Sequence, residues 1–180
     1  MQFVFGYGSL AADLAGGEVA ALRGYRRVWG VAMDNRLDLP GYKHYRLRSD
    51  GSRPPVFVAY LDLEPDEEGV THGLCVPIAA GALAAIDARE RNYDRVDVTD
   101  AVSPAPGRVW AYIGTPVGRA RLDEARAAGR AVVSADYLHR TRAAFEAIGE
   151  APLAEFEATA ALDGLPVWDL ERLENPRSPI

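Results

Sequence analysis

The sequence predicts an α+β protein, and three observations support that fold class. Strand-like segments rich in β-branched and aromatic residues follow one another with short turns, as in Val56–Leu63 and Val70–Ile78 around the turn Pro65–Gly69. Helical segments separate the strands too rarely for a doubly wound sheet, because at most one βαβ unit can be traced. The length of 180 residues, with 48% hydrophobic residues, suits one domain with its own core.

The first predicted strand leads into a glycine-containing turn. Phe3–Phe5 are aromatic or β-branched and predict a short strand. Gly6 and Gly8 allow a sharp turn, and Ser9 is a good N-cap for a helix over Ala11–Leu22. Backbone N–H groups in such a turn suit a carboxylate, a phosphate or an oxyanion, and a plain strand–turn–helix corner has the same spacing.

A long polar segment follows the second strand. Tyr25–Met33 has the composition of a strand, and Asp34–Pro55 is rich in charge, glycine and proline. The pattern predicts a long loop, with a short extended piece at Tyr42–Leu47, and loops of this length are often functional. Its positive charges either receive an anionic substrate or face solvent: Arg36, Lys43, Arg46, Arg48 and Arg53.

The sequence predicts neither a metal site nor cysteine chemistry. His72 and Cys75 are three residues apart in one predicted strand and therefore point to opposite faces. His44 and His139 stand alone, and zinc-binding spacing is absent. A single cysteine forms no internal disulfide, so we expect a reducing, cytoplasmic location.

A glutamate lies on the inward face of the next predicted helix. Gly81–Asn92 has a helical composition, with an apolar stripe through Leu83 and Ile86. Glu90 is four residues after Ile86 and seven after Leu83, so it continues the same stripe. A buried carboxylate without a partner is costly. Three interpretations of Glu90 therefore remain: it is a functional residue, it is buried and paired with an arginine, or it lies at a helix end that is exposed to solvent.

The remaining chain predicts two strands and then mainly helices. Arg95–Val98 and Arg108–Gly114 have strand composition, and Tyr112 and Trp110 lie on one face of the second. Further helices are predicted at Gly118–Gly129, between the cap Ser134 and the stop Gly149, and at Leu153–Leu162.

Three segments together resemble the γ-glutamylcyclotransferase-like (AIG2/ChaC-like) superfamily. Phe5–Leu10 (FGYGSL) is similar to its N-terminal signature, above all in the glutathione-degrading ChaC-type branch. Arg89–Tyr93 (RERNY) resembles its Arg-Glu…Tyr segment, and Val133–Leu138 (VSADYL) resembles its C-terminal helix. One difference is that the family often has glycine between the glutamate and the tyrosine, where this chain has Arg91 and Asn92.

The resemblance implies a mixed, partly closed β-barrel flanked by α-helices. It implies a single domain over residues 1–180, with the barrel core at about 1–115 and a helical extension at about 116–180. Glu90 is implied as the catalytic base, and no cofactor or metal is implied. The implied substrate-binding residues are Tyr7, Gly8, Ser9, Leu10 and Tyr112.

The implied reaction closes a ring within a γ-glutamyl amide. The α-amine of the substrate attacks its own γ-carbonyl, which gives 5-oxoproline and releases an amine, amino acid or peptide. Both reacting groups belong to one molecule, so the enzyme mainly folds the substrate and moves protons. A glutamate near the amine accepts its proton and delivers it to the leaving nitrogen.

Two other functions fit parts of the pattern. One is a non-catalytic module on the same fold that binds a small acid. The other is a dinucleotide-binding protein, because Gly6–Ala11 matches G-x-G-x-x-A and Asp34 ends the next predicted strand.

The net charge of −6 argues against nucleic acid as a partner. No apolar run suits a membrane span and no leader precedes the first strand. The sequence leaves the particular γ-glutamyl substrate and the oligomeric state open.

Overall fold

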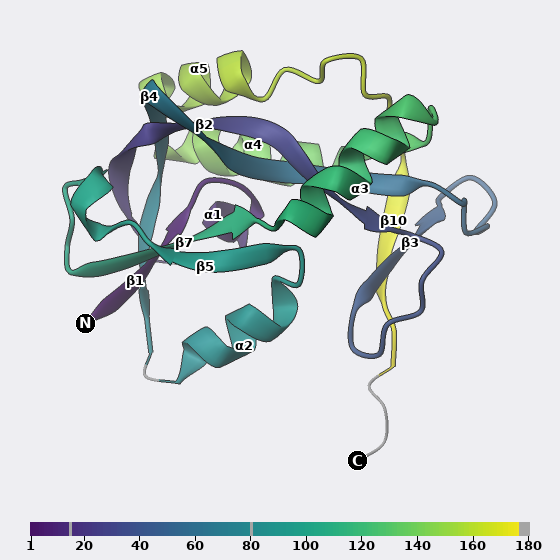
Figure 1. Cartoon of the computed structure of the whole chain (residues 1–180), viewed down its shortest axis with the longest axis horizontal. Helices are drawn as coiled ribbons and strands as arrows, with labels where there is room; N and C mark the ends of the chain where they lie inside the picture. Colours follow the sequence, from purple (N-terminus) through teal and green to yellow (C-terminus); the bar gives the residue numbers. More distant parts are fainter. Residues whose placement is uncertain (15, 80, 177–180) are drawn as a thin grey trace.

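The computed structural model describes residues 1–14, 16–79 and 81–176 (Figure 1). The strands are β1 (Gln2–Gly6), β2 (Glu18–Asp34), β3 (Lys43–Leu47), β4 (Phe57–Ile78), β5 (Tyr93–Asp97), β6 (Val102–Ser103), β7 (Arg108–Gly114), β8 (Ala131–Ser134), β9 (Val167–Trp168) and β10 (Leu170–Glu174). The helices are α1 (Ser9–Asp13), α2 (Ala82–Arg89), α3 (Pro116–Ala127), α4 (Ala135–Ile148) and α5 (Glu150–Thr159), with a 3₁₀ turn at Thr99–Ala101.

One mixed sheet forms the centre of the molecule, with the strand order β5-β7-β1-β4-β2-β6. Strand β1 runs parallel to β7 and antiparallel to β4, and β8 adds to β4 in a parallel pairing. A separate pair, β3 and β10, lies to one side of this sheet (Figure 1). The sheet is therefore mixed and partly closed, with helices around it, as the resemblance implied.

Strands β2 and β4 correct the predicted hairpin. Val56–Leu63 and Val70–Ile78 belong to one continuous strand, β4, and both halves pair with β2 rather than with each other. The predicted turn Pro65–Gly69 is an irregularity inside this strand, opposite Gly24 of β2. The alternating pattern of each half was interpreted correctly, but alternation does not specify the pairing partner.

The first helix is shorter than the sequence predicted. The prediction over Ala11–Leu22 is wrong for the described residues after Asp13, because α1 ends there, Leu14 is already extended and β2 begins at Glu18. Gly16 adopts a positive φ of 79° in the connection, and the residues from Glu18 onward pair with β4. Gly8, rather than Ser9, is the N-cap of α1.

The topology also excludes the dinucleotide-binding arrangement. The strand after α1 runs in the same direction as β1, but β4 lies between them and pairs antiparallel with both, so β1 and β2 are not the adjacent parallel strands of a dinucleotide-binding βαβ unit. Asp34 ends that strand and makes an ion pair with Arg36.

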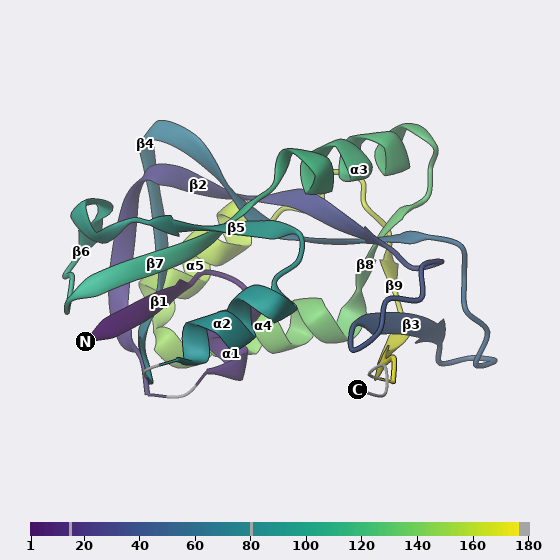
Figure 2. The ribbon, with the colours of Figure 1, turned by 60° about the horizontal axis from the view of Figure 1, so that its bottom comes forward.

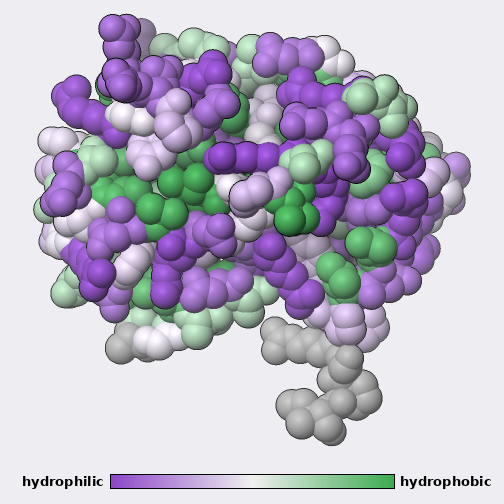
Figure 3. Space-filling model, viewed as in Figure 1, coloured by the Kyte–Doolittle hydropathy of each residue, from purple (hydrophilic) through white to green (hydrophobic). Residues whose placement is uncertain are grey.

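The helices pack on different sides of the sheet. Helix α3 lies across β2, whereas α1 and α2 lie with α4 below the sheet in the turned view (Figure 2). The core is continuous through the buried middle of β4, and Phe57–Leu63 are buried on both faces. Figure 3 shows hydrophilic side chains over most of one face, with hydrophobic groups in smaller patches between them. Among the described residues, no helix has the length and hydrophobicity needed to cross a bilayer.

Candidate active site

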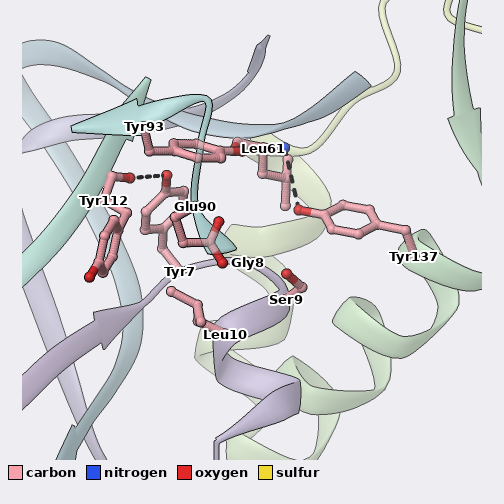
Figure 4. A pocket seen from close by; sticks show the side chains of 9 residues that line it. All are labelled: Tyr7, Gly8, Ser9, Leu10, Leu61, Glu90, Tyr93, Tyr112 and Tyr137. Carbon is pink, nitrogen blue, oxygen red and sulfur yellow. Dashed lines mark hydrogen bonds between the residues drawn. The ribbon is translucent and has the colours of Figure 1, made fainter. Parts of the chain in front are cut away.

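A small cavity lies where the N-terminal turn, the end of α2 and helix α4 meet (Figure 4). Its volume is about 30 Å³, which holds a few atoms of a ligand rather than a nucleotide. The lining residues are Tyr7, Gly8, Ser9, Leu10, Leu61, Glu90, Tyr93, Tyr112 and Tyr137. All six site residues predicted from the sequence are therefore brought together around one space.

Glu90 enters this cavity from the end of α2. The helix lies on the rest of the protein through Leu83 and Ile86, and the Glu90 N–H closes its last turn by donating to Ile86 O at 2.9 Å. The Glu90 side chain is 13% exposed, with Oε1 3.1 Å from the Arg89 guanidinium. Tyr93 N donates to Glu90 O at 3.0 Å, so Arg91 and Asn92 form a tight turn without a glycine.

Ion pairs hold the end of α2 against its neighbours. Arg89 of α2 pairs with Asp13 of α1, and Arg140 of α4 lies 3.3 Å from the same carboxylate. Asp13 thus joins three helices that are distant in the sequence. Since these helices carry lining residues of the cavity, the pairs restrict movement of Glu90 relative to the turn that faces it.

The turn from Tyr7 to Leu10 is compact because two glycines allow close approach. A Cβ at Gly6 would lie 2.7 Å from Ala11 N, and one at Gly8 would lie 3.2 Å from the Tyr137 hydroxyl. Ala11 N donates to Gly8 O at 3.0 Å, which closes the turn. The backbone of this turn therefore forms part of the cavity wall, in the place where the sequence predicted a binding surface.

Three tyrosine side chains form rigid walls. The Tyr7 hydroxyl donates to Tyr112 O at 2.5 Å, and the Tyr93 hydroxyl donates to Leu61 O at 2.8 Å. The Tyr137 hydroxyl accepts a long bond, 3.4 Å, from Leu61 N. Burial raises the pKa of all three hydroxyls, so they stay protonated at neutral pH.

The Tyr137 hydroxyl differs from the other two because its proton is not donated to any residue that the structure describes. It is therefore available to a ligand oxygen. Sequence reasoning assigned no role to Tyr137, Tyr93 or Leu61. Tyr137 and Tyr93 fall in segments that resemble the superfamily, and that resemblance was the signal that could have identified them.

Tyr112 lines the cavity in a different way from the one expected. Its backbone carbonyl holds Tyr7, whereas its hydroxyl donates to Asp87 at 2.7 Å (Figure 4 shows the hydroxyl away from Glu90). Asp87 in turn lies 3.1 Å from Arg95. A contact between Tyr112 and a substrate would therefore come from its ring.

A buried arginine supports the turn from behind. Arg27 Nε donates to Tyr7 O at 2.8 Å, and its Nη1 contacts both oxygens of Glu155 at 3.0 Å. The guanidinium lies 4.5 Å from the Phe145 ring centre and 5.1 Å from that of Phe156. Arg27 thus connects the cavity wall to α4 and α5.

No cluster of metal-binding side chains is found in the described ranges. No protein-family model and no curated protein matches the chain. The chain does match the crystal structure of YkqA from Bacillus subtilis, with a TM-score of 0.58 and 14% sequence identity. The match covers 92% of this chain and 55% of YkqA, so this chain spans little more than half of that protein's length. It confirms the γ-glutamylcyclotransferase-like fold, and at this identity it concerns the fold alone.

Proposed function

We propose that the protein is a γ-glutamylcyclotransferase that converts a γ-glutamyl amide into 5-oxoproline and a free amine, amino acid or peptide. The observation that carries this proposal is the convergence of the Glu90 carboxylate and the Tyr7–Leu10 turn on one cavity. Two sequence motifs that are distant in the chain predicted that convergence, and the fold is the one that the resemblance implied.

Glu90 acts as the base. At neutral pH the α-amine of the substrate is mostly an ammonium group, which cannot attack. Glu90 accepts one of its protons, and the freed lone pair attacks the γ-carbonyl carbon. The bond from that carbon to the leaving nitrogen then breaks as Glu90 returns the proton to that nitrogen. Glu90 also takes the second proton that the ring nitrogen loses and passes it to the released amine, so the products are the neutral lactam 5-oxoproline and an ammonium ion. Within the described ranges Glu90 makes one ion pair, from Oε1 to Arg89, which leaves its other oxygen to accept from an ammonium group.

The other lining groups orient the glutamyl part. The backbone of Tyr7–Leu10 offers N–H groups to a carboxylate or to the developing oxyanion, and the Tyr137 hydroxyl offers a further donor. The remaining tyrosine rings restrict the chain to a folded shape, which favours ring closure.

The test is to assay release of 5-oxoproline from a panel of γ-glutamyl compounds. Glu90→Gln should keep the fold and substrate binding and lower kcat by about 10²–10⁴-fold. Glu124→Gln makes the same change on an exposed face of α3 and should leave kcat unaltered. Near-normal turnover by Glu90→Gln would remove Glu90 from this role. Binding of γ-glutamyl compounds without 5-oxoproline would instead indicate a non-catalytic module.

A further inference from the structure

Three of the five cations in the segment between β2 and β4 are paired with carboxylates. Arg36 pairs with Asp34, Arg48 with Asp136 and Asp169, and Arg53 with Asp38. Arg46 is exposed and contacts only the Gly51 carbonyl, at 3.4 Å. Lys43 is different, because no salt bridge or hydrogen bond involves its ammonium group within the part of the chain that the structure describes.

The Lys43 ammonium lies on aromatic faces instead of beside a carboxylate. Its Nζ is 4.0 Å from the ring centre of Tyr60 and 5.5 Å from that of Tyr42. Glu174 is the cross-strand neighbour of Lys43 in the β3–β10 pair, but its carboxylate contacts Arg172. The three N–H donors of Lys43 are therefore available to a ligand.

Both aromatic contacts place Lys43 beside the candidate active site. The Tyr60 ring packs edge-on against Tyr137, with ring centres 5.1 Å apart, and Tyr137 lines the cavity. The Tyr42 hydroxyl accepts a hydrogen bond from Asn92, two residues after Glu90. Lys43 does not line the cavity itself, so it lies outside the space that holds the glutamyl end.

We propose that Lys43 binds a carboxylate on the leaving part of the substrate and so selects γ-glutamyl compounds with an anionic leaving group over neutral γ-glutamyl amines. This inference rests on the proposed function. The glutamyl end enters the small cavity with its reacting atoms, and the leaving part of the substrate extends toward β3. The ammonium group has no carboxylate partner among the described residues, and a carboxylate of the substrate would complete its hydrogen bonds.

The charges around Lys43 fit this assignment. Burial lowers the pKa of Lys43 to about 8, while the Glu90 carboxylate acts in the opposite direction. Arg172 and Arg89 also lower this pKa, and Asp13 raises it. Lys43 remains mostly charged at pH 7, where it would offset the repulsion between Glu90 and an incoming carboxylate.

The experiment compares γ-glutamylalanine with γ-glutamylethylamide, which differ only in one carboxylate. The wild type should have the higher kcat/KM for γ-glutamylalanine. Lys43→Met should lower that value by about 10–100-fold, as expected for a lost charge-assisted contact, and leave the value for the ethylamide nearly unchanged. Arg46→Met removes an exposed cation from the same strand and should alter neither value. Lys43→Gln and a thermal unfolding curve of each variant control for folding.

Each other outcome decides the inference as well. Equal kcat/KM values for the two compounds in the wild type, or equal losses for both in Lys43→Met, would overturn the role of Lys43 and leave the cyclotransferase intact. If neither compound yields 5-oxoproline, the proposed function fails, and calorimetry with the same two compounds decides the role of Lys43. Tighter binding of γ-glutamylalanine that Lys43→Met abolishes would support it, and equal or absent binding would overturn it.

Discussion

Replacement of Arg27 by methionine should destabilise the protein strongly, although Arg27 makes no contact with the cavity itself. The side chain is fully buried and donates to the Tyr7 and His72 carbonyls, to Thr159 and to both oxygens of Glu155. Methionine fills much of the space beside the stacked Phe145 and Phe156 rings but donates no hydrogen bond. The Glu155 carboxylate, which is 15% exposed, would lose its counter-charge.

The expected loss in the free energy of unfolding is about 3–5 kcal/mol, the usual cost of removing one partner from a buried ion pair. Most of that cost comes from the carboxylate left without a cation. Glu155→Gln removes this charge and keeps an oxygen that can accept from His72 N, which now donates to Glu155 at 3.1 Å. The double variant Arg27→Met/Glu155→Gln should therefore lose about 1–3 kcal/mol less than the sum of the single variants.

Urea unfolding at pH 7, followed by circular dichroism, measures all three variants. Arg26→Met is the matched control, because the neighbouring Arg26 is 54% exposed and its pairs with Glu64 and Asp66 lie in solvent, where an ion pair contributes about 0–1 kcal/mol. Additive losses for Arg27 and Glu155, within about 0.5 kcal/mol, would refute the reasoning. Equal losses for Arg27→Met and Arg26→Met would refute it too.

Three further predictions concern the site and its surroundings. Lys43→Met should raise the free energy of unfolding at pH 7, since it removes a cation without a partner. The folded pKa of Lys43, about 8, lies below its ordinary value of 10.5, so the unfolded state binds more protons between these values. The wild type should therefore approach the variant in stability from pH 8 to pH 10.5, and a constant difference in urea midpoints would contradict this. Gly6→Ala should cost about 1–3 kcal/mol in urea unfolding, because its Cβ would lie 2.7 Å from Ala11 N, and a loss below about 0.5 kcal/mol would contradict that close approach. Tyr137→Phe should lower kcat/KM for 5-oxoproline release by about 10–100-fold and stability by no more than about 1 kcal/mol, because its hydroxyl accepts one long bond. An unaltered kcat/KM would show that the hydroxyl is not used.

The candidate site was the most predictable part of the molecule because local sequence determines it. The helical period placed Glu90 on the stripe of Leu83 and Ile86, and the structure has the three residues on the inward side of α2. Gly6 and Gly8 likewise indicated a close backbone approach, which the spacing to Ala11 N and to the Tyr137 hydroxyl bears out. The position of Glu90 on its helix and the approach of Gly6 to Ala11 are local in the sequence, whereas the approach of Gly8 to Tyr137 depends on how α4 packs.

The strand pairing could not be predicted in the same way. Val56–Leu63 and Val70–Ile78 have the alternation of a hairpin, and the same alternation suits one long strand along a long partner. The available signal was the glycine pair Gly16-Gly17, which lies between the early end of α1 and Glu18–Leu22, the start of β2. The short strands β8, β9 and β10 had no signal of this kind, because they exist only through the neighbours that they pair with.

Among the acidic side chains near Tyr7, Glu90 is the one whose surroundings suit the proposed proton transfer. Asp62 is buried and accepts from Leu63 N, Gly114 N and Arg119, at 2.7, 2.6 and 2.8 Å. The Glu155 carboxylate likewise accepts several hydrogen bonds, from Arg27, His72 N and the Thr159 hydroxyl. A carboxylate whose oxygens already accept several hydrogen bonds has little capacity for a substrate ammonium, and its protonation would break the contacts that hold the fold. Among the described residues Glu90 makes one ion pair, with Arg89, and it faces a cavity, so under the proposed function it can exchange a proton with a substrate while the sheet stays intact.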